Sequence, residues 1–109
     1  MFSMFSSSVD PVERSAEAQA QVDAQTEKIK LYHFESCPFC ARVRSTIDSL
    51  ALNIEYRDTR MDPQNSDDLL AGGGKRTVPA LRIEQEDGSV QWMYESSDIM
   101  QYLNHRFAA

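Results

Sequence analysis

The chain has 109 residues, of which 41% are hydrophobic and 26% charged, as in an ordinary globular domain. This length fits one domain with a single core, and no apolar run approaches the roughly 18 residues that a membrane span needs. The formal net charge of −6 argues against a nucleic-acid partner, because phosphate binding requires a basic surface. We therefore expect a soluble domain with no nucleic-acid partner and no membrane span. We also expect a monomer, and the cysteine usage favours a reducing compartment, the cytoplasm.

The first 27 residues differ in composition from the rest, so we divide the chain into an extension (residues 1–27) and a globular domain (residues 28–109). Residues 1–8 are rich in serine and are expected to be disordered. Ala, Gln and Glu then favour a helix to about residue 27, with Asp10 as N-cap and Pro11 in the first turn. The apolar positions of this helix form only a thin stripe; they are Val12, Ala16, Ala20 and Val22. We expect a helical extension, docked or loose, that takes no part in catalysis.

Both cysteines of the chain lie in Cys37-Pro38-Phe39-Cys40, here called the CPFC motif. The apolar run of residues 28–34 predicts a central strand before it. Pro38 suits the first turn of a helix, and apolar residues at i, i+3, i+7 and i+10 from Cys40 predict that this helix continues to about residue 51. A strand that delivers a Cys-x-x-Cys to a helix N-terminus is typical of a thiol–disulfide redox centre.

The next segment contains a second strand and a second helix. Alternation over residues 53–58 predicts a strand with Ile54 and Tyr56 pointing inward. A helix is then expected to begin at Asp62-Pro63, to bury Leu69 and Leu70, and to end at residues 72–74, which are all glycine. The glycines and the lysine after them superficially resemble a phosphate-binding loop. Such a loop would follow a strand and carry Ser or Thr after the lysine, so we interpret the glycines as a helix end.

The last third predicts a hairpin and a helix. Strands are expected at residues 77–83 and 90–94, joined at Asp87-Gly88. A helix with Ser96 as N-cap follows, and its buried face consists of Ile99, Leu103 and Phe107. The order β-α-β-α-β-β-α, preceded by the extra helix, predicts an α/β fold with a mixed four-stranded sheet covered by helices.

In this order and spacing, four features make residues 28–107 resemble a glutaredoxin, a member of the thioredoxin-fold superfamily. They are Leu31-Tyr32 leading to the CPFC motif, Thr77-Val78-Pro79, Asp87-Gly88, and Tyr94-Glu95-Ser96-Ser97-Asp98-Ile99. The last is similar to the Glu-Ser-x-x-Ile signature of glutathione transferase N-terminal domains. The chain departs from the usual glutaredoxin in having Phe39 instead of Tyr, and Phe34-Glu35-Ser36 where a lysine is often found upstream.

The resemblance implies a glutathione-dependent oxidoreductase that reduces protein disulfides and glutathione mixed disulfides. Cys37, at the helix N-terminus, would be the nucleophile, because N–H groups there favour a thiolate. Cys40, on the buried face, would be less ionised and would resolve mixed disulfides. We expect Glu35 to oppose ionisation of Cys37 and Arg42 or Arg44 to favour it, although the helix positions of the two arginines point them away from Cys37.

The resemblance also implies where glutathione, the expected co-substrate, would bind. Main-chain groups of Thr77, Val78 and a cis Pro79 would pair with its cysteinyl part, close to Cys37 and Phe39. The helix N-terminus at Ser96 would bind the γ-glutamyl carboxylate, and Glu95, with Asp98 as second choice, the α-amino group. Arg76, with Lys75 as second choice, would bind the glycyl carboxylate.

Other functions remain open at this point. A pair of such chains holding a [2Fe–2S] cluster between thiolates and glutathione is the main alternative, and a glutathione transferase fragment is another. A mononuclear zinc site would need two further ligands, and the only histidines, His33 and His105, lie far apart in the predicted fold. We expect no metal and no tightly bound cofactor, and the expected partners are glutathione and disulfide-containing or glutathionylated proteins.

Overall fold

A computed structural model describes residues 11–108 of the protein. Its elements in chain order are α1 (Ala16–Thr26), β1 (Ile29–His33), α2 (Pro38–Ser49), β2 (Glu55–Asp58), α3 (Pro63–Gly73), β3 (Ala80–Glu84), β4 (Val90–Met93) and α4 (Ser96–Phe107). The predicted β-α-β-α-β-β-α order, preceded by a helix, is confirmed. Within residues 11–108 no helix has the length and apolar character to cross a membrane.

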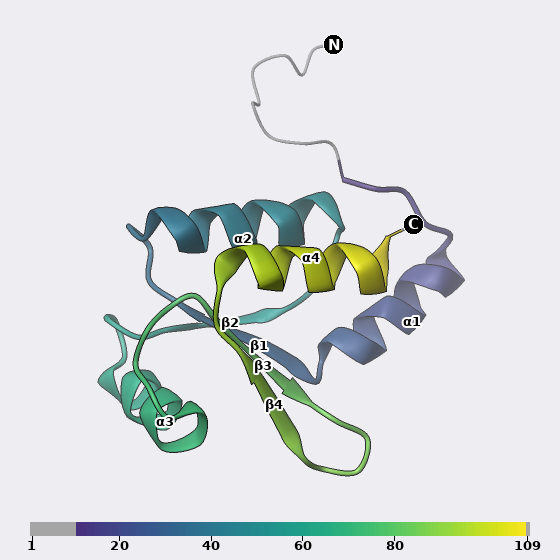
Figure 1. Ribbon diagram of the computed structural model, residues 1–109. Helices are drawn as coiled ribbons and strands as arrows, with labels where there is room; N and C mark the ends of the chain where they lie inside the picture. Colours follow the sequence, from purple (N-terminus) through teal and green to yellow (C-terminus); the bar gives the residue numbers. More distant parts are fainter. Residues whose placement is uncertain (1–10, 109) are drawn as a thin grey trace.

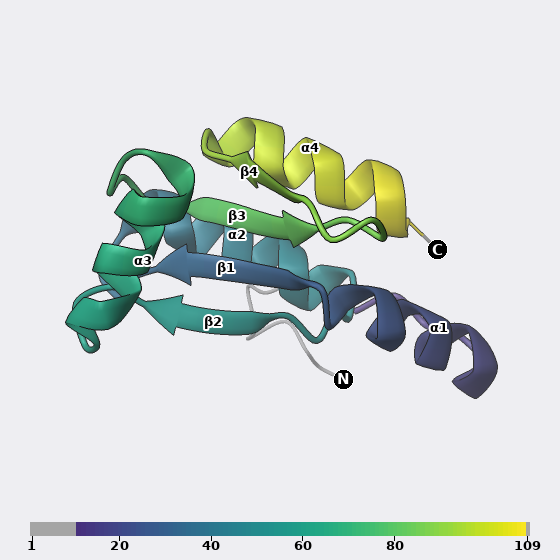
Figure 2. The same cartoon turned by 90° about the horizontal axis from the view of Figure 1, so that it is seen from below.

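The four strands form one mixed sheet in the order β2-β1-β3-β4. Strand β1 pairs in parallel with β2 and antiparallel with β3, and β4 completes the hairpin. Helices α2 and α4 lie side by side over one face of the sheet, and α3 lies on the other (Figures 1 and 2). This arrangement is a thioredoxin-like fold. It sets the CPFC motif after the C-terminal end of β1.

The larger hydrophobic core lies between the sheet and the helices α2 and α4. The spacing expected for α2 is confirmed, because Cys40, Val43 and Ile47 are all buried. Helix α4 buries Ile99, Leu103 and Phe107, as predicted. Apolar side chains from the two helices and from β1 and β3 therefore hold the CPFC helix on the sheet.

Two predictions of buried residues are wrong, one on α3 and one on β2. Leu69 is fully buried, but Leu70 is 41% exposed, because consecutive helical residues cannot both face the sheet. Tyr56 on β2 is also exposed and packs its ring on His33, with 5.0 Å between the centroids. The inward residue of that segment is Ile54, which precedes the strand.

The glycines of α3 do more than end a helix. Gly74 is the C-cap and has a φ of 92°, as the prediction required. Gly72 and Gly73, however, are helical, and a side chain on either would overlap Trp92 or Tyr94 of the hairpin. They therefore allow the close approach of α3 to the end of β4.

The extension begins its helix later than the sequence predicted and is docked. Residues 1–8 and Asp10 lie outside the described residues, but residues 11–15 are not helical, and Ser15 is the N-cap of α1. Arg14 donates to the carbonyl oxygens of Leu50 (2.7 Å) and Phe107 (2.6 Å), and Val12 packs against the larger core. These contacts explain the late start, because they hold residues 12 and 14 in an extended segment.

Candidate functional site

The CPFC motif forms the N-terminus of α2, and Cys37 is its N-cap. Pro38 occupies the first helical position, where its missing N–H costs no hydrogen bond. The Cys37 Sγ accepts the main-chain N–H of Cys40 at 3.2 Å. A sulfur in this position lies among helix N–H groups that have no partner within the helix, so it can carry negative charge.

The two thiols differ in exposure. Cys40 is fully buried, whereas Cys37 is 5% exposed, and both are free thiols. Burial, aided by the hydrogen bond with Cys37, raises the pKa of Cys40 to about 12. Phe39 between them is 54% exposed. Cys37 is therefore the sulfur that a reactant can reach.

A groove of about 250 Å³ adjoins the motif at Phe39. It is formed by the start of α2, the turn before β3, the residue after β4 and the start of α4. Its lining consists of Phe39, Lys75, Thr77, Val78, Pro79, Tyr94, Glu95 and Ser96. Six of these were singled out in the sequence as first-choice glutathione contacts, and the fold brings them together from three separate segments of the chain.

Main-chain groups at the groove are available for a ligand. The peptide bond between Val78 and Pro79 is cis. Within residues 11–108 the Val78 main chain makes no hydrogen bond. At the start of α4 the N-cap is Glu95, one residue earlier than the predicted Ser96, and no side chain caps the first turn. Both segments can therefore donate hydrogen bonds to a carboxylate or a peptide.

The cation at the groove is Lys75, which was the second choice in the sequence. Its Nζ lies 4.5 Å from the centre of the Tyr94 ring, and the Tyr94 hydroxyl donates to the Lys75 carbonyl oxygen. The first choice, Arg76, pairs with Asp67 at 3.0 Å and is not among the lining residues. Tyr94 was not singled out as a site residue; its only sequence signal is its position directly before Glu95.

The two arginines of α2, Arg42 and Arg44, make different contacts. The Arg42 guanidinium is exposed and lies 5.6 Å from the centre of the Phe39 ring. Arg44 was expected to point away from Cys37, but it is half-buried and donates to the carbonyl oxygens of Phe34 and Glu35, in the loop before the motif. The expectation was wrong because a long side chain can fold back along its helix.

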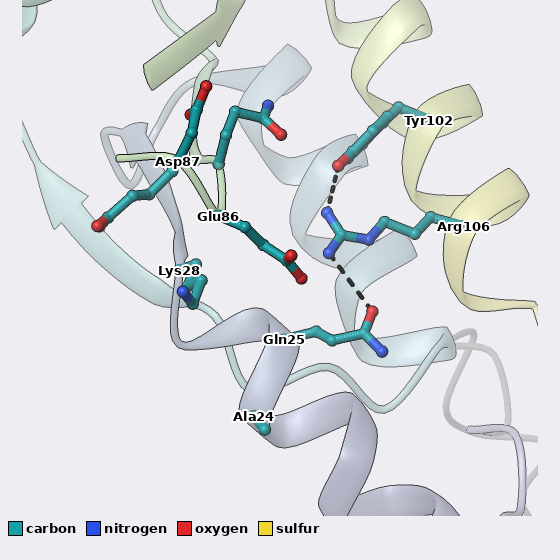
Figure 3. Close-up of a pocket in the computed structure, with 9 residues that line it drawn as sticks. Ala24, Gln25, Lys28, Glu86, Asp87, Tyr102 and Arg106 are labelled. Carbon is teal, nitrogen blue, oxygen red and sulfur yellow. Dashed lines mark hydrogen bonds between the residues drawn. The ribbon is translucent and has the colours of Figure 1, made fainter. Parts of the chain in front are cut away.

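A larger hollow lies elsewhere, at the opposite end of β1. It measures about 790 Å³ and lies between α1, the β3–β4 hairpin and α4 (Figure 3). Its lining mixes acidic groups (Glu84, Glu86, Asp87) with basic ones (Lys28, Arg106), and Arg106 contacts Tyr102 and Gln25. The described residues that line it include no cysteine, serine or threonine. Within residues 11–108 no three His, Cys, Asp or Glu side chains cluster in a way that would hold a metal ion.

The fold and the groove define a thioredoxin-fold domain. Residues 31–109 match the family model described as "Glutathione S-transferase, N-terminal domain". The chain belongs to this family. The matched residues begin within β1 and include the rest of the sheet, the CPFC motif and the groove, but not α1.

Solved structures of glutathione enzymes share this fold. Glutathione transferase E6 from Drosophila melanogaster is 29% identical, with a TM-score of 0.57 over 74% of this chain and 36% of its own. Maleylacetoacetate isomerase from Anaeromyxobacter dehalogenans 2CP-1, with bound dicarboxyethyl glutathione and citrate in the active site, is 27% identical, with a TM-score of 0.55 over 73% and 37%. The trimeric glutathione transferase TDR1 of Leishmania is 28% identical, with a TM-score of 0.60 over 73% and 18%. This chain thus spans well under half the length of these neighbours.

Proposed function

We propose that the protein is a glutathione-dependent thiol–disulfide oxidoreductase of the glutaredoxin type, with residues 28–109 as its catalytic domain. The observation that carries this proposal is the Cys37 sulfur at the N-terminus of α2, in the motif whose Phe39 lines a groove with donors from two other segments. A thiolate there is a nucleophile toward disulfides. The match to a glutathione-using family supports glutathione as the co-substrate.

The simplest reaction uses Cys37 alone. Its thiolate attacks the glutathione sulfur of a protein–glutathione mixed disulfide, and the protein leaves as a thiolate that takes up a proton. A second glutathione thiolate then attacks the glutathione sulfur held on Cys37. Oxidised glutathione forms and the Cys37 thiolate returns, so one disulfide is exchanged for another with no net electron loss.

Substrates with their own disulfide require Cys40. After Cys37 has attacked, the Cys40 thiolate displaces the substrate's second sulfur, which forms the Cys37–Cys40 disulfide and releases a dithiol. Two glutathione molecules then reduce that disulfide. Because burial raises the pKa of Cys40 to about 12, this step is slow near neutral pH, and the single-thiol route dominates.

The groove offers partners for each part of glutathione. The Val78 main chain pairs with the cysteinyl part, and the first N–H groups of α4 bind the γ-glutamyl carboxylate. Glu95 binds the α-amino group, and Lys75 binds the glycyl carboxylate in place of Arg76, which is paired with Asp67. A reducing compartment such as the cytoplasm would supply the glutathione, and the protein acts there as a monomer on disulfide-containing and glutathionylated proteins.

The test is glutathione-coupled reduction of a small glutathione mixed disulfide by the wild type, Cys37→Ser and Cys40→Ser. We expect Cys37→Ser to lose all activity and Cys40→Ser to keep more than half. Full activity of Cys37→Ser would refute the mechanism. The single substitutions differ only in which sulfur is lost, so each is the structural control of the other.

Two alternatives give different readouts. Because the family is that of transferases, the same proteins are assayed for conjugation of glutathione to an aromatic chloride. Conjugation that survives in Cys37→Ser would favour a transferase. A brown colour with visible absorbance after anaerobic purification would favour a glutathione-bridged [2Fe–2S] carrier; we expect colourless protein.

A further inference from the structure

The loop that leads from β1 to Cys37 is held by one side chain of α2. The Arg44 guanidinium donates to the carbonyl oxygens of Phe34 (3.3 Å) and Glu35 (3.1 Å), and it also contacts Nδ1 of His33 at 2.8 Å. Three consecutive residues are thus tied to a single planar group. Its donors are fixed in direction, so the loop has one preferred path.

This contact reaches the nucleophile through a shared acceptor. The Phe34 carbonyl oxygen accepts both from Arg44 and from the main-chain N–H of Cys37, at 3.2 Å. The Cys37 Sγ in turn accepts the Cys40 N–H. Arg44 therefore helps to orient the Cys37 backbone without touching a reactant.

His33 determines whether Arg44 can stay in this position. It is buried at the end of β1, and its Nδ1 has to accept the Arg44 hydrogen bond, since a guanidinium only donates. Its ring proton is therefore on Nε2. A protonated His33 would turn an N–H, and a positive charge, toward Arg44.

We propose that Arg44 is a positioning residue for Cys37 and that protonation of His33 releases it, which lowers the reactivity of Cys37 in acid. This inference rests on the proposed role of Cys37 as the nucleophile. When His33 gains a proton, the 2.8 Å contact becomes repulsive and Arg44 moves away from the loop carbonyls. The backbone at Cys37 then loses its fixed orientation.

The surroundings of His33 set the direction of this pH dependence. The other groups that face it are Glu35 in the loop and Asp58 and Tyr56 on β2. Burial and the Arg44 charge lower the pKa of His33 from its usual 6.5, and the two carboxylates offset part of this. The Arg44–His33 contact is therefore complete above pH 6.5 and is lost as the pH falls through the lower pKa of the folded protein.

The experiment measures alkylation of Cys37 by iodoacetamide from about pH 4.5 to 8 in a Cys40→Ser background. Each rate is divided by the thiolate fraction, which is followed by ultraviolet absorbance, so that only reactivity per thiolate remains. The variants added to this background are Arg44→Met, Arg44→Lys and His33→Asn. In His33→Asn the amide oxygen takes the place of Nδ1 as the acceptor, and it does not titrate. Arg106→Met, which removes the same charge far from the motif, is the control. The His33 ring is titrated in parallel by NMR.

We expect the rate per thiolate of the background protein to fall roughly tenfold or more in acid, with the midpoint of the His33 titration. His33→Asn removes this fall, and Arg44→Met shows the low acid rate already at neutral pH. Arg44→Lys lies between them, and Arg106→Met behaves like the background. A neutral-pH rate of Arg44→Met equal to the background, or an acid fall that persists in His33→Asn, overturns the proposal.

Two features keep the result interpretable. If Arg44→Met does not fold, the comparison of Arg44→Lys with His33→Asn still decides, because the two variants are expected to shift the profile in opposite directions. Alkylation needs no glutathione. An inactive wild type in the glutathione-coupled assay would therefore refute the proposed function and leave the positioning role of Arg44 intact.

Discussion

Arg14 connects the extension to the two helices that form the site, and replacing it is the sharpest test of what the extension does. Its guanidinium donates to the carbonyl oxygen of Leu50, the C-cap of α2, and to that of Phe107, the last residue of α4. Carbonyls at helix C-termini have no partner within the helix and carry partial negative charge. Arg14→Ala leaves both without the cation.

The size of the effect follows from these two bonds. A hydrogen bond to a charged group contributes about 1.5–3 kcal/mol. Arg14 is only half-buried, so water replaces part of this loss, and we expect Arg14→Ala to lower the free energy of unfolding by about 2 kcal/mol in total. Arg14→Lys, whose compact ammonium does not span both carbonyls, keeps one of them satisfied and loses about half as much.

The assay is urea unfolding followed by circular dichroism, with Glu13→Ala as the control. Glu13 is the exposed neighbour of Arg14 in the same extended segment, so its replacement reports any general effect of changing the extension. We expect Glu13→Ala to differ from the wild type by less than about 0.5 kcal/mol. Equal unfolding midpoints for Arg14→Ala and Glu13→Ala would refute the reasoning and leave α1 as a passive appendage.

Three further predictions concern the site. Gly73→Ala pushes Tyr94 away from Lys75 and lowers the free energy of unfolding by about 1–2 kcal/mol, measured by calorimetry. Adding Tyr94→Ala should restore part of this loss, and a double variant no more stable than Gly73→Ala would contradict the clash. A mixed disulfide of Cys37 with a coloured thiol reports the reactivity of Cys40, which releases the thiol. Because burial raises the pKa of Cys40 to about 12, the rate of release should rise about tenfold per pH unit up to pH 9.0. A plateau of this rate near neutral pH in stopped-flow absorbance would contradict the prediction. Glu95→Gln should weaken glutathione binding about tenfold in calorimetric titration without changing the unfolding midpoint, and unchanged affinity would remove Glu95 from the site.

The elements with a repeating pattern were predictable from the sequence. Cys40, Val43 and Ile47 recur at helical spacing, and this pattern depends only on which face is buried. The hairpin at Asp87-Gly88 was predictable from its turn residues, because Gly88 has a φ of 89° that few other residues adopt. Local chemistry decided these cases, and distant contacts did not change them.

The errors arose where distant contacts decide. Pro11 suits a helix start as well as an extended segment, and the choice depends on contacts of Val12 and Arg14 with residues from both α2 and α4. Lys75 and Arg76 are adjacent in a turn, where no periodicity tells which one faces the groove. The pairing of Arg76 with Asp67 settles this, and it depends on how α3 is placed.

If Cys37 is the nucleophile proposed above, its burial would act as a steric filter on reactants. The residue is only 5% exposed, so an incoming disulfide would have to present its own sulfur end-on to reach the Cys37 sulfur. Thiol–disulfide exchange needs three sulfurs nearly in line, which a disulfide inside a rigid folded domain cannot offer without opening. The protein would thus discriminate by the local flexibility of a disulfide more than by the sequence around it, and frayed or unfolding proteins would react first.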